Sequence, residues 1–186
     1  MQRLPPGSHG IPADLVARNQ GERLVAAMAE VCAERGYAGA SVAEVAKRAG
    51  VSSLTFYKQF ASKEDCLLAA HLQLLGRLLE ELDRAVAGPE PQGGGGSELG
   101  PRVALRTALS IFAADPPSAR LLTVEVLAAG PEGVRHHDAT VEAFAERLGV
   151  DWIRAAGLLA LIGKLAVAGE ADRLPELEDE LVATLS

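Results

Sequence analysis

Apolar residues recur along most of this chain at intervals of three and four positions, and glycine or proline interrupts the pattern repeatedly. That spacing places apolar side chains on one face of a helix, whereas the strict alternation that indicates a strand is missing from the sequence. Hydrophobic residues make up 48% of the chain and aromatic residues only 4%. The bulk comes from Ala, Leu and Val, and Ala and Leu are among the stronger helix formers. We therefore predict an all-α protein.

The interruptions predict about nine helices in two groups. The first group holds a helix from about Asp14 to Arg35 that Gly36 ends, two short helices on either side of Gly50, and a long helix from Ser62 to about Ala87. The second group holds five more helices, over residues 101–114, 117–129, 133–148, 151–168 and 174–185.

The stretch from Ser41 to Lys63 has the layout of a helix-turn-helix, two short helices joined by a glycine turn. Ser41 and Glu44 fit a capping box that opens the first short helix. Gly50 stands where the turn requires a positive φ, which glycine adopts without steric cost. Val51 and Phe56 are expected to pack the pair onto the preceding helix.

The outer surface of the second short helix is expected to carry hydroxyl, amide and ammonium groups, on Ser52, Ser53, Thr55, Tyr57, Lys58 and Gln59. A helix of this size fits the major groove of B-form DNA, where such groups read base edges or bind phosphate. Lys63 follows in the first turn of the next helix, where free backbone N–H groups also favour an anion. These residues predict a DNA-binding surface, although a glycine turn between short helices also occurs in proteins that bind no nucleic acid.

The charge is divided unevenly along the chain. The net charge is −7, but residues 1–63 hold 8 Lys and Arg against 5 Asp and Glu, a balance of +3. The remaining residues hold 10 against 20, a balance of −10. A basic first third joined to an acidic remainder is typical of a protein that meets phosphate at one end.

Residues 20–70 resemble the DNA-binding domain of the tetracycline-repressor (TetR) family. The resemblance lies in the connected segments AEVCAERGY, SVAEVAKRAGVS, TFYKQF and SKE, which begin at Ala29, Ser41, Thr55 and Ser62. It implies phosphate contacts by Tyr57 and Lys63, base reading by Ser53, Thr55 and Lys58, and a place near the DNA backbone for Ser41. The chain departs from the family at Leu54, where a small residue or proline is common, at Gln59, commonly aromatic or histidine, and at Cys66, commonly leucine.

The resemblance also implies a division of the chain. We expect a flexible arm over residues 1–13, a three-helix DNA-binding domain over 14–62, and a ligand-binding and dimerisation domain over 63–186 that contains a flexible glycine-rich loop at 89–100. The long helix from Ser62 would join the two domains. The implied function is that of a transcriptional repressor that binds a palindromic operator as a homodimer and is released by a small apolar or amphipathic molecule.

Members of this family build their dimer interface from the last two long helices, here about 151–168 and 174–185. The first of these is apolar nearly all round, more than a monomer would bury on one face. The predicted interface residues are Trp152, Ile153, Leu158, Leu159, Ile162, Leu177 and Leu181. A central core helix in a monomer is the alternative.

The candidate residues for the effector site are Phe112, Thr123, Glu125, Leu127 and Trp152, with His71 and Arg106 as polar anchors. The sequence contains no nucleophile elbow, no phosphate-binding glycine loop after a strand and no metal-ligand spacing. His136 and His137 are adjacent, so their side chains diverge by about 100° on a helix and make a poor chelate. We expect no enzyme activity, no cofactor and no metal.

Two alternatives to the repressor remain open, an activator of the same fold and a helical interaction module without DNA binding. The two cysteines, Cys32 and Cys66, lie inside apolar helical patterns and are expected to be buried free thiols. The sequence holds no apolar run near 18 residues and no signal peptide at its N-terminus. We therefore expect a cytoplasmic protein that does not associate with membranes.

Overall fold

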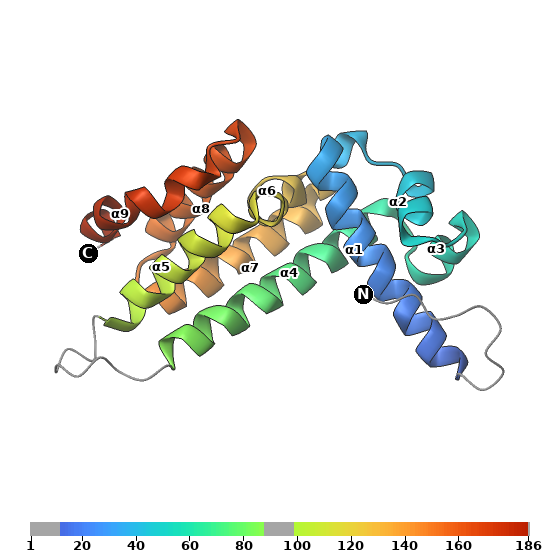
Figure 1. Cartoon of the computed structure of the whole chain (residues 1–186), viewed down its shortest axis with the longest axis horizontal. Helices are drawn as coiled ribbons and strands as arrows, with labels where there is room; N and C mark the ends of the chain where they lie inside the picture. The colour runs from blue at the N-terminus through green and yellow to red at the C-terminus, as the bar shows by residue number, and fades with distance from the viewer. Residues whose placement is uncertain (1–11, 88–98, 186) are drawn as a thin grey trace. The chain divides into compact units, whose positions relative to one another are not determined.

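The structure of this protein, a computed structural model, describes residues 12–87 and 99–185 (Figure 1). These residues form nine α-helices and two 3-10 helices and contain no strand, which confirms the predicted all-α fold. Residues 1–11 of the predicted arm and most of the predicted glycine-rich loop lie outside the described residues. The last two loop residues, Leu99 and Gly100, instead begin a helix.

The helices before the undescribed loop are α1 (Ala13–Gly39), α2 (Val42–Ala49), α3 (Ser53–Gln59) and α4 (Lys63–Val86). Those after it are α5 (Leu99–Ala114), α6 (Pro116–Thr123), η1 (Glu125–Ala129), α7 (Gly130–Leu148), α8 (Trp152–Ala168), η2 (Ala171–Leu177) and α9 (Glu178–Leu185).

Two predicted α-helices prove to be composite. The one expected over 117–129 ends at Thr123, whose hydroxyl donates to the Ala119 carbonyl at 2.7 Å, and continues as the 3-10 helix η1. The one expected over 174–185 begins as the 3-10 helix η2, which contains Pro175. Proline has no N–H to donate, so it does not support α-helical hydrogen bonding there.

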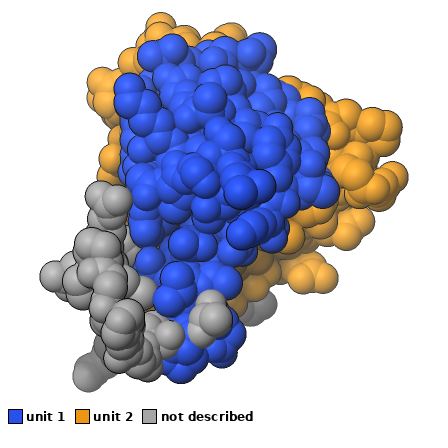
Figure 2. Space-filling view, turned by 90° about the vertical axis from the view of Figure 1, so that its right-hand side faces the viewer, with its two compact units in different colours: residues 1–70 blue, residues 71–186 orange. Residues whose placement is uncertain are grey.

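The described chain divides into two compact units, residues 1–70 (unit 1) and residues 71–186 (unit 2), which Figure 2 colours separately. Unit 1 contains α1, α2, α3 and the first turns of α4, and unit 2 contains the rest of α4 and all later helices. None of the described helices is both long enough and apolar enough to cross a membrane.

The interior of unit 1 is built from the apolar faces of its helices. Leu24, Met28 and Val31 of α1 are fully buried together with Val45 of α2 and Phe56 of α3. The first helix breaks at Gly36 as predicted, because this residue has a φ of 69° and a ψ of 164°. Residues 37–39 then form one further helical turn.

Both cysteines belong to this interior, which confirms the prediction that they are buried. The Cys32 Sγ lies 3.7 Å from the Met28 Sδ, and the Cys66 Sγ lies 3.7 Å from the Leu24 carbonyl oxygen. Burial raises the pKa of the Cys66 thiol to about 12. The thiolate form of Cys66 is therefore scarce at neutral pH.

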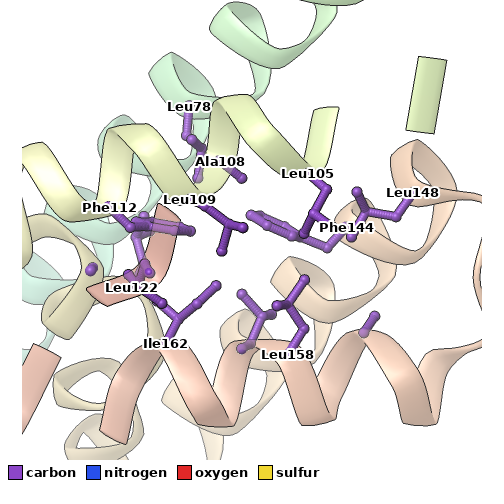
Figure 3. Packing of buried hydrophobic residues seen from close by; sticks show 14 of the residues in the cluster. Leu78, Leu105, Ala108, Leu109, Phe112, Leu122, Phe144, Leu148, Leu158 and Ile162 are labelled. Atoms are coloured by element: carbon purple, nitrogen blue, oxygen red, sulfur yellow. The ribbon is translucent and has the colours of Figure 1, made fainter. Parts of the chain in front are cut away.

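The interior of unit 2 lies between α5, α7 and α8 (Figure 3). The rings of Phe112 and Phe144 stack with centroids 6.1 Å apart and planes 16° from parallel. Predicted as dimer-interface residues, Leu158, Leu159 and Ile162 are instead buried in this core. These residues lie on the face of α8 that packs against α6 and α7. Helical periodicity alone does not distinguish a face that packs inside the monomer from one that faces a partner subunit.

Candidate nucleic-acid interface

The helix-turn-helix is fixed locally by two serine caps and one glycine. The Ser41 Oγ accepts the backbone N–H of Glu44 at 3.2 Å, and the Ser52 Oγ accepts that of Thr55 at 3.1 Å. Gly50 has a φ of 65° and a ψ of 39°, the left-handed conformation predicted for the turn. The sequence between residues 41 and 59 therefore folds into two short helices with a sharp reversal between them.

Ion pairs tie α2 to α1. The Arg48 guanidinium donates to both carboxylate oxygens of Glu34, at 2.6 and 2.7 Å, and these bonds hold the pKa of Glu34 below its usual value. Arg35 pairs with Glu44 at 3.0 Å, so the Glu44 carboxylate faces α1. The Arg23 side chain donates to the carbonyl of Ala49 at the end of α2.

The buried side of α3 is held by a single large residue. Phe56 is fully buried, and its ring centroid lies 5.5 Å from that of Tyr57 and 5.8 Å from that of Phe60. Gln59 is half-buried against α1, because its Oε1 lies 3.3 Å from the position that a Cβ on Gly21 would occupy. The absence of a side chain at Gly21 thus makes room for the Gln59 amide.

The opposite side of α3 is open. Ser53, Leu54, Tyr57 and Lys58 are exposed, Leu54 at 68% and Tyr57 at 58%. Thr55 is half-buried, and its hydroxyl lies 3.0 Å from that of Ser52. The predicted contact residues of α3 other than Gln59 therefore form one polar surface that includes a leucine.

Lys63 takes part in a cluster that the sequence did not indicate. Its Nζ donates to the carbonyl oxygens of Tyr37 and Ala40, at 3.0 and 3.1 Å, and stands 3.9 Å from the centroid of the Tyr37 ring. The Tyr37 hydroxyl donates to the Glu64 carboxylate at 2.6 Å. Burial and this carboxylate raise the pKa of Tyr37, and the same bond lowers the pKa of Glu64.

The ammonium of Lys63 thus satisfies carbonyls at the end of α1 and in the turn that precedes Ser41. The first turn of α4, which begins at Lys63, also contains the acidic residues Glu64 and Asp65. The Asp65 N–H donates to the Ser62 hydroxyl at 3.0 Å. Ser41 itself is exposed at the start of α2. The structure therefore brings the predicted residues of α3 other than Gln59 to one surface and gives Lys63 partners within unit 1.

The residues predicted for the effector site fall into two sets in unit 2. The side chains of His71, Phe112, Thr123 and Glu125 are buried. Leu127 and Trp152 are exposed, at 41% and 47%. Arg106 is exposed too, and its guanidinium donates to the Glu178 carboxylate at 2.9 to 3.0 Å.

A buried polar cluster surrounds His71. The Nε2 of His71 lies 3.1 Å from the Thr140 hydroxyl, and the His71 and His136 rings meet edge to face with centroids 5.6 Å apart. The Nδ1 atom of His136 is buried without a hydrogen-bond partner among the described residues. Sequence reasoning missed Thr140, although its spacing of four residues from His136 places both on one face of α7.

Burial makes His71 a source of pH-dependent stability. It lowers the pKa of His71 to about 4, with a further contribution from the neighbouring His136 and His137. In the unfolded chain His71 has an ordinary pKa near 6.5. As the pH falls below that value, His71 therefore becomes protonated in the unfolded chain while it stays neutral in the folded chain. Stability from the neutral imidazole is therefore complete above pH 6.5 and is lost as pH falls towards 4.

We expect the free energy of unfolding to drop by about 2 kcal/mol between pH 7 and pH 5 through His71 alone. The His71→Leu variant should lose that part of the pH dependence, since the Thr140 hydroxyl keeps its bond to the His136 carbonyl at 3.1 Å. Urea unfolding at both pH values measures the difference. The His137→Gln variant should keep most of the drop, because burial is the larger cause of the lowered pKa of His71. An equal drop in His71→Leu would contradict the assignment.

One face of α8 is open to solvent and partly apolar. Ile153 is 78% exposed and Val167 52%, and the small residues Gly157 and Ala160 lie exposed between them. Of the other predicted interface residues, Trp152 is exposed, whereas Leu177 and Leu181 are half-buried. Where the chain is described, no three His, Cys, Asp or Glu side chains gather closely enough to hold a metal ion.

Residues 24–70, from the middle of α1 to the first turns of α4, match the family described as bacterial regulatory proteins, tetR family. This segment contains the capped helix pair, the Gly50 turn and the exposed surface of α3. This segment of the chain belongs to the tetR family. Its recognition from the residues around the helix-turn-helix is therefore confirmed, and its fold and family are those of transcription regulators.

Curated and structural relatives of this chain agree with that match. The fatty acid metabolism regulator protein of Bacillus subtilis (strain 168) is 34% identical over 64 residues, which are 34% of this chain and 33% of that protein. The chain thus matches about a third of the length of this relative.

Solved structures extend the likeness beyond the N-terminal segment. The fatty acid degradation regulator FadR from Bacillus halodurans matches with a TM-score of 0.70 and 18% identity, over 99% of this chain and 96% of that one. FadR from Bacillus subtilis in complex with stearoyl-CoA matches with a TM-score of 0.70 and 20% identity, over 88% and 96%. A transcriptional regulator from Rhodococcus sp. Rha1 matches with a TM-score of 0.66 and 28% identity, over 89% and 95%.

Proposed function

We propose that this chain is a ligand-responsive transcriptional repressor that binds a palindromic DNA operator as a homodimer. One observation carries the proposal: within the segment that matches the family, α3 is anchored by Phe56 and leaves Ser53, Tyr57 and Lys58 exposed on its other side. Hydroxyl and ammonium groups on one face of a short helix suit the edges of bases and the phosphates beside them.

In this proposal DNA is contacted by Ser41, Ser52, Ser53, Thr55, Tyr57 and Lys58. Gln59 and Lys63 support this surface and do not contact DNA in this proposal. Gln59 lies against α1, and the Lys63 ammonium donates to two carbonyls of unit 1. The proposed division into a DNA-binding domain up to about residue 62 and an effector and dimerisation domain beyond it agrees with this distribution of roles.

Selection of bound duplexes from a random DNA library, at two salt concentrations, tests DNA recognition. We expect an enriched palindrome with half-sites centred about one helical turn apart, roughly 34 Å, because a two-fold dimer presents two copies of α3. Enrichment of a single half-site would exclude the dimeric mode. No enrichment at either salt would favour the alternative of a helical interaction module without DNA binding.

The proposed dimer uses the open face of α8, where Ile153 projects furthest into solvent. In a two-fold interface each substitution acts twice, so Ile153→Glu should weaken dimerisation by at least about 2 kcal/mol, roughly thirtyfold. Sedimentation velocity over a concentration series measures the shift. The control is Val134→Glu, a similar change at a 46% exposed residue of α7. An unchanged dimer in Ile153→Glu would place the interface elsewhere.

The proposed effector is a small apolar or amphipathic molecule bound in unit 2. Stearoyl-CoA is the first compound to test, because it is the ligand in the complex of the FadR from Bacillus subtilis. An effector releases the operator only if it binds the free protein more tightly than the DNA-bound protein. Calorimetric titration of both forms measures this difference, and equal affinities would remove the ligand-release mechanism.

The sign of regulation is a separate test. A repressor reduces transcription from a promoter that carries the selected operator, and an activator of the same fold increases it. We propose repression, without catalysis, since the fold and the family are those of regulators rather than enzymes.

A further inference from the structure

We infer that Leu54 contacts the C5 methyl group of a thymine in the major groove and makes that thymine part of the operator. The inference rests on the proposed function and names one base that the DNA-binding surface selects. It comes from the exposed side of α3, where one apolar side chain stands among polar ones.

Leu54 contributes little to the interior of unit 1. At 68% exposure it is the most exposed large hydrophobic residue of the described part of this unit, ahead of Tyr57 and Leu15. The opposite side of α3 is already anchored by the fully buried Phe56. The fold of unit 1 would therefore tolerate a polar residue at position 54. A single exposed leucine does not by itself indicate a binding site, because isolated hydrophobic residues are common on protein surfaces.

Leu54 lies on the same face of α3 as two of the proposed DNA-contacting residues. Tyr57 and Lys58 follow it by three and four residues, so the three side chains share one face of α3. Both neighbours are exposed, and Ser53 is exposed beside them. If this face enters the major groove, Leu54 enters with it and must lie against the edge of a base pair.

The major-groove edges of DNA bases differ in how well they suit a leucine. Guanine, adenine and cytosine present hydrogen-bonding groups and no methyl group there, and an alkyl side chain would desolvate these groups without replacing their bonds. Thymine alone among the four presents an apolar methyl group. The hydroxyls and ammonium nearby bind several bases, whereas the leucine side chain discriminates in favour of the methyl group.

Replacing thymine by uracil tests the contact, because uracil keeps every hydrogen-bonding group and lacks only the methyl group. Starting from the selected operator, each thymine is replaced in turn and the affinity measured by fluorescence anisotropy. At one position we expect about fourfold weaker binding for one half-site, the value of one buried methyl group, and about fifteenfold when both half-sites are changed. The Leu54→Ala variant should bind thymine and uracil operators equally.

Leu72→Ala is the matched control, since Leu72 is also an exposed leucine, at 56%, but lies in unit 2. It should keep the full sensitivity to uracil. A second arm separates the methyl group from the rest of the base: cytosine at the same position should bind weakly, and 5-methylcytosine should restore about fourfold for the parent protein and nothing for Leu54→Ala.

The outcomes separate this inference from the proposed function. A selected operator whose thymines are all insensitive to uracil, or that contains no preferred thymine, overturns the role of Leu54 and leaves DNA recognition intact. Sensitivity to uracil that persists in Leu54→Ala assigns the methyl contact to another residue and also overturns it. Failure to select any duplex overturns both.

Discussion

The Phe56→Ala variant is expected to lose operator binding through the collapse of unit 1 rather than through any DNA contact. Phe56 is fully buried and is the largest side chain that α3 contributes to the interior of unit 1. Truncating a buried phenylalanine removes its transfer free energy and leaves a cavity, a cost of about 3–5 kcal/mol. Since α3 spans only Ser53–Gln59, little else holds this helix in place.

Urea unfolding and hydrogen exchange of the amides between residues 42 and 60 measure this effect in the full chain. The Leu54→Ala variant is the control on the same helix, because Leu54 is exposed and its truncation should change stability by less than about 0.5 kcal/mol. Phe56→Ala with native exchange protection in α3 would show that other contacts hold the helix.

Lys63→Met should destabilise unit 1 by about 2 kcal/mol in the absence of DNA. The change keeps most of the side-chain stem but leaves the carbonyls of Tyr37 and Ala40 without the ammonium and removes the cation from the Tyr37 ring. Loss of a partner by partly buried carbonyls costs about 1–3 kcal/mol, and loss of a cation–π contact adds to it. Operator affinity should fall because the turn before Ser41 loosens.

The salt dependence of binding distinguishes this role from a phosphate contact. Each phosphate contact that is lost lowers the slope of log affinity against log salt by about one unit. We expect Lys63→Met to leave the slope unchanged, and Lys58→Met to lower it by about one unit per subunit while leaving stability unchanged, because Lys58 is exposed. A lowered slope with unchanged stability in Lys63→Met would instead support the direct phosphate contact implied by the family resemblance.

Local features of this fold were predictable because they depend on a few adjacent residues. The cap at Ser41, the left-handed Gly50 and the break at Gly36 each follow from the conformational preference of one residue type in its immediate context. The all-α class follows in the same way from periodicity. The exposure of Ser53, Tyr57 and Lys58 was predictable too, whereas Gln59, expected on the same surface, is half-buried against α1.

Features that depend on contacts between distant segments were not predictable in this way. Lys63 and Tyr37 are 26 residues apart, and only the folded turn between α1 and α2 brings carbonyls to the lysine. Likewise, α8 is apolar nearly all round, so periodicity did not show that Leu158 and Ile162 point into the core while Ile153 points out. The pairing of His71 with Thr140 spans 69 residues and carries no local signal.

The burial of both native thiols makes this chain suitable for site-specific labelling without prior removal of its cysteines. Cys32 and Cys66 are buried, and the raised pKa of Cys66 keeps it in the unreactive thiol form. A cysteine introduced at exposed Ala43 of α2, which is not one of the proposed DNA contacts, would therefore react selectively with a maleimide fluorophore. Such a probe on α2 would report the arrival of a DNA duplex optically, with every proposed contact residue retained.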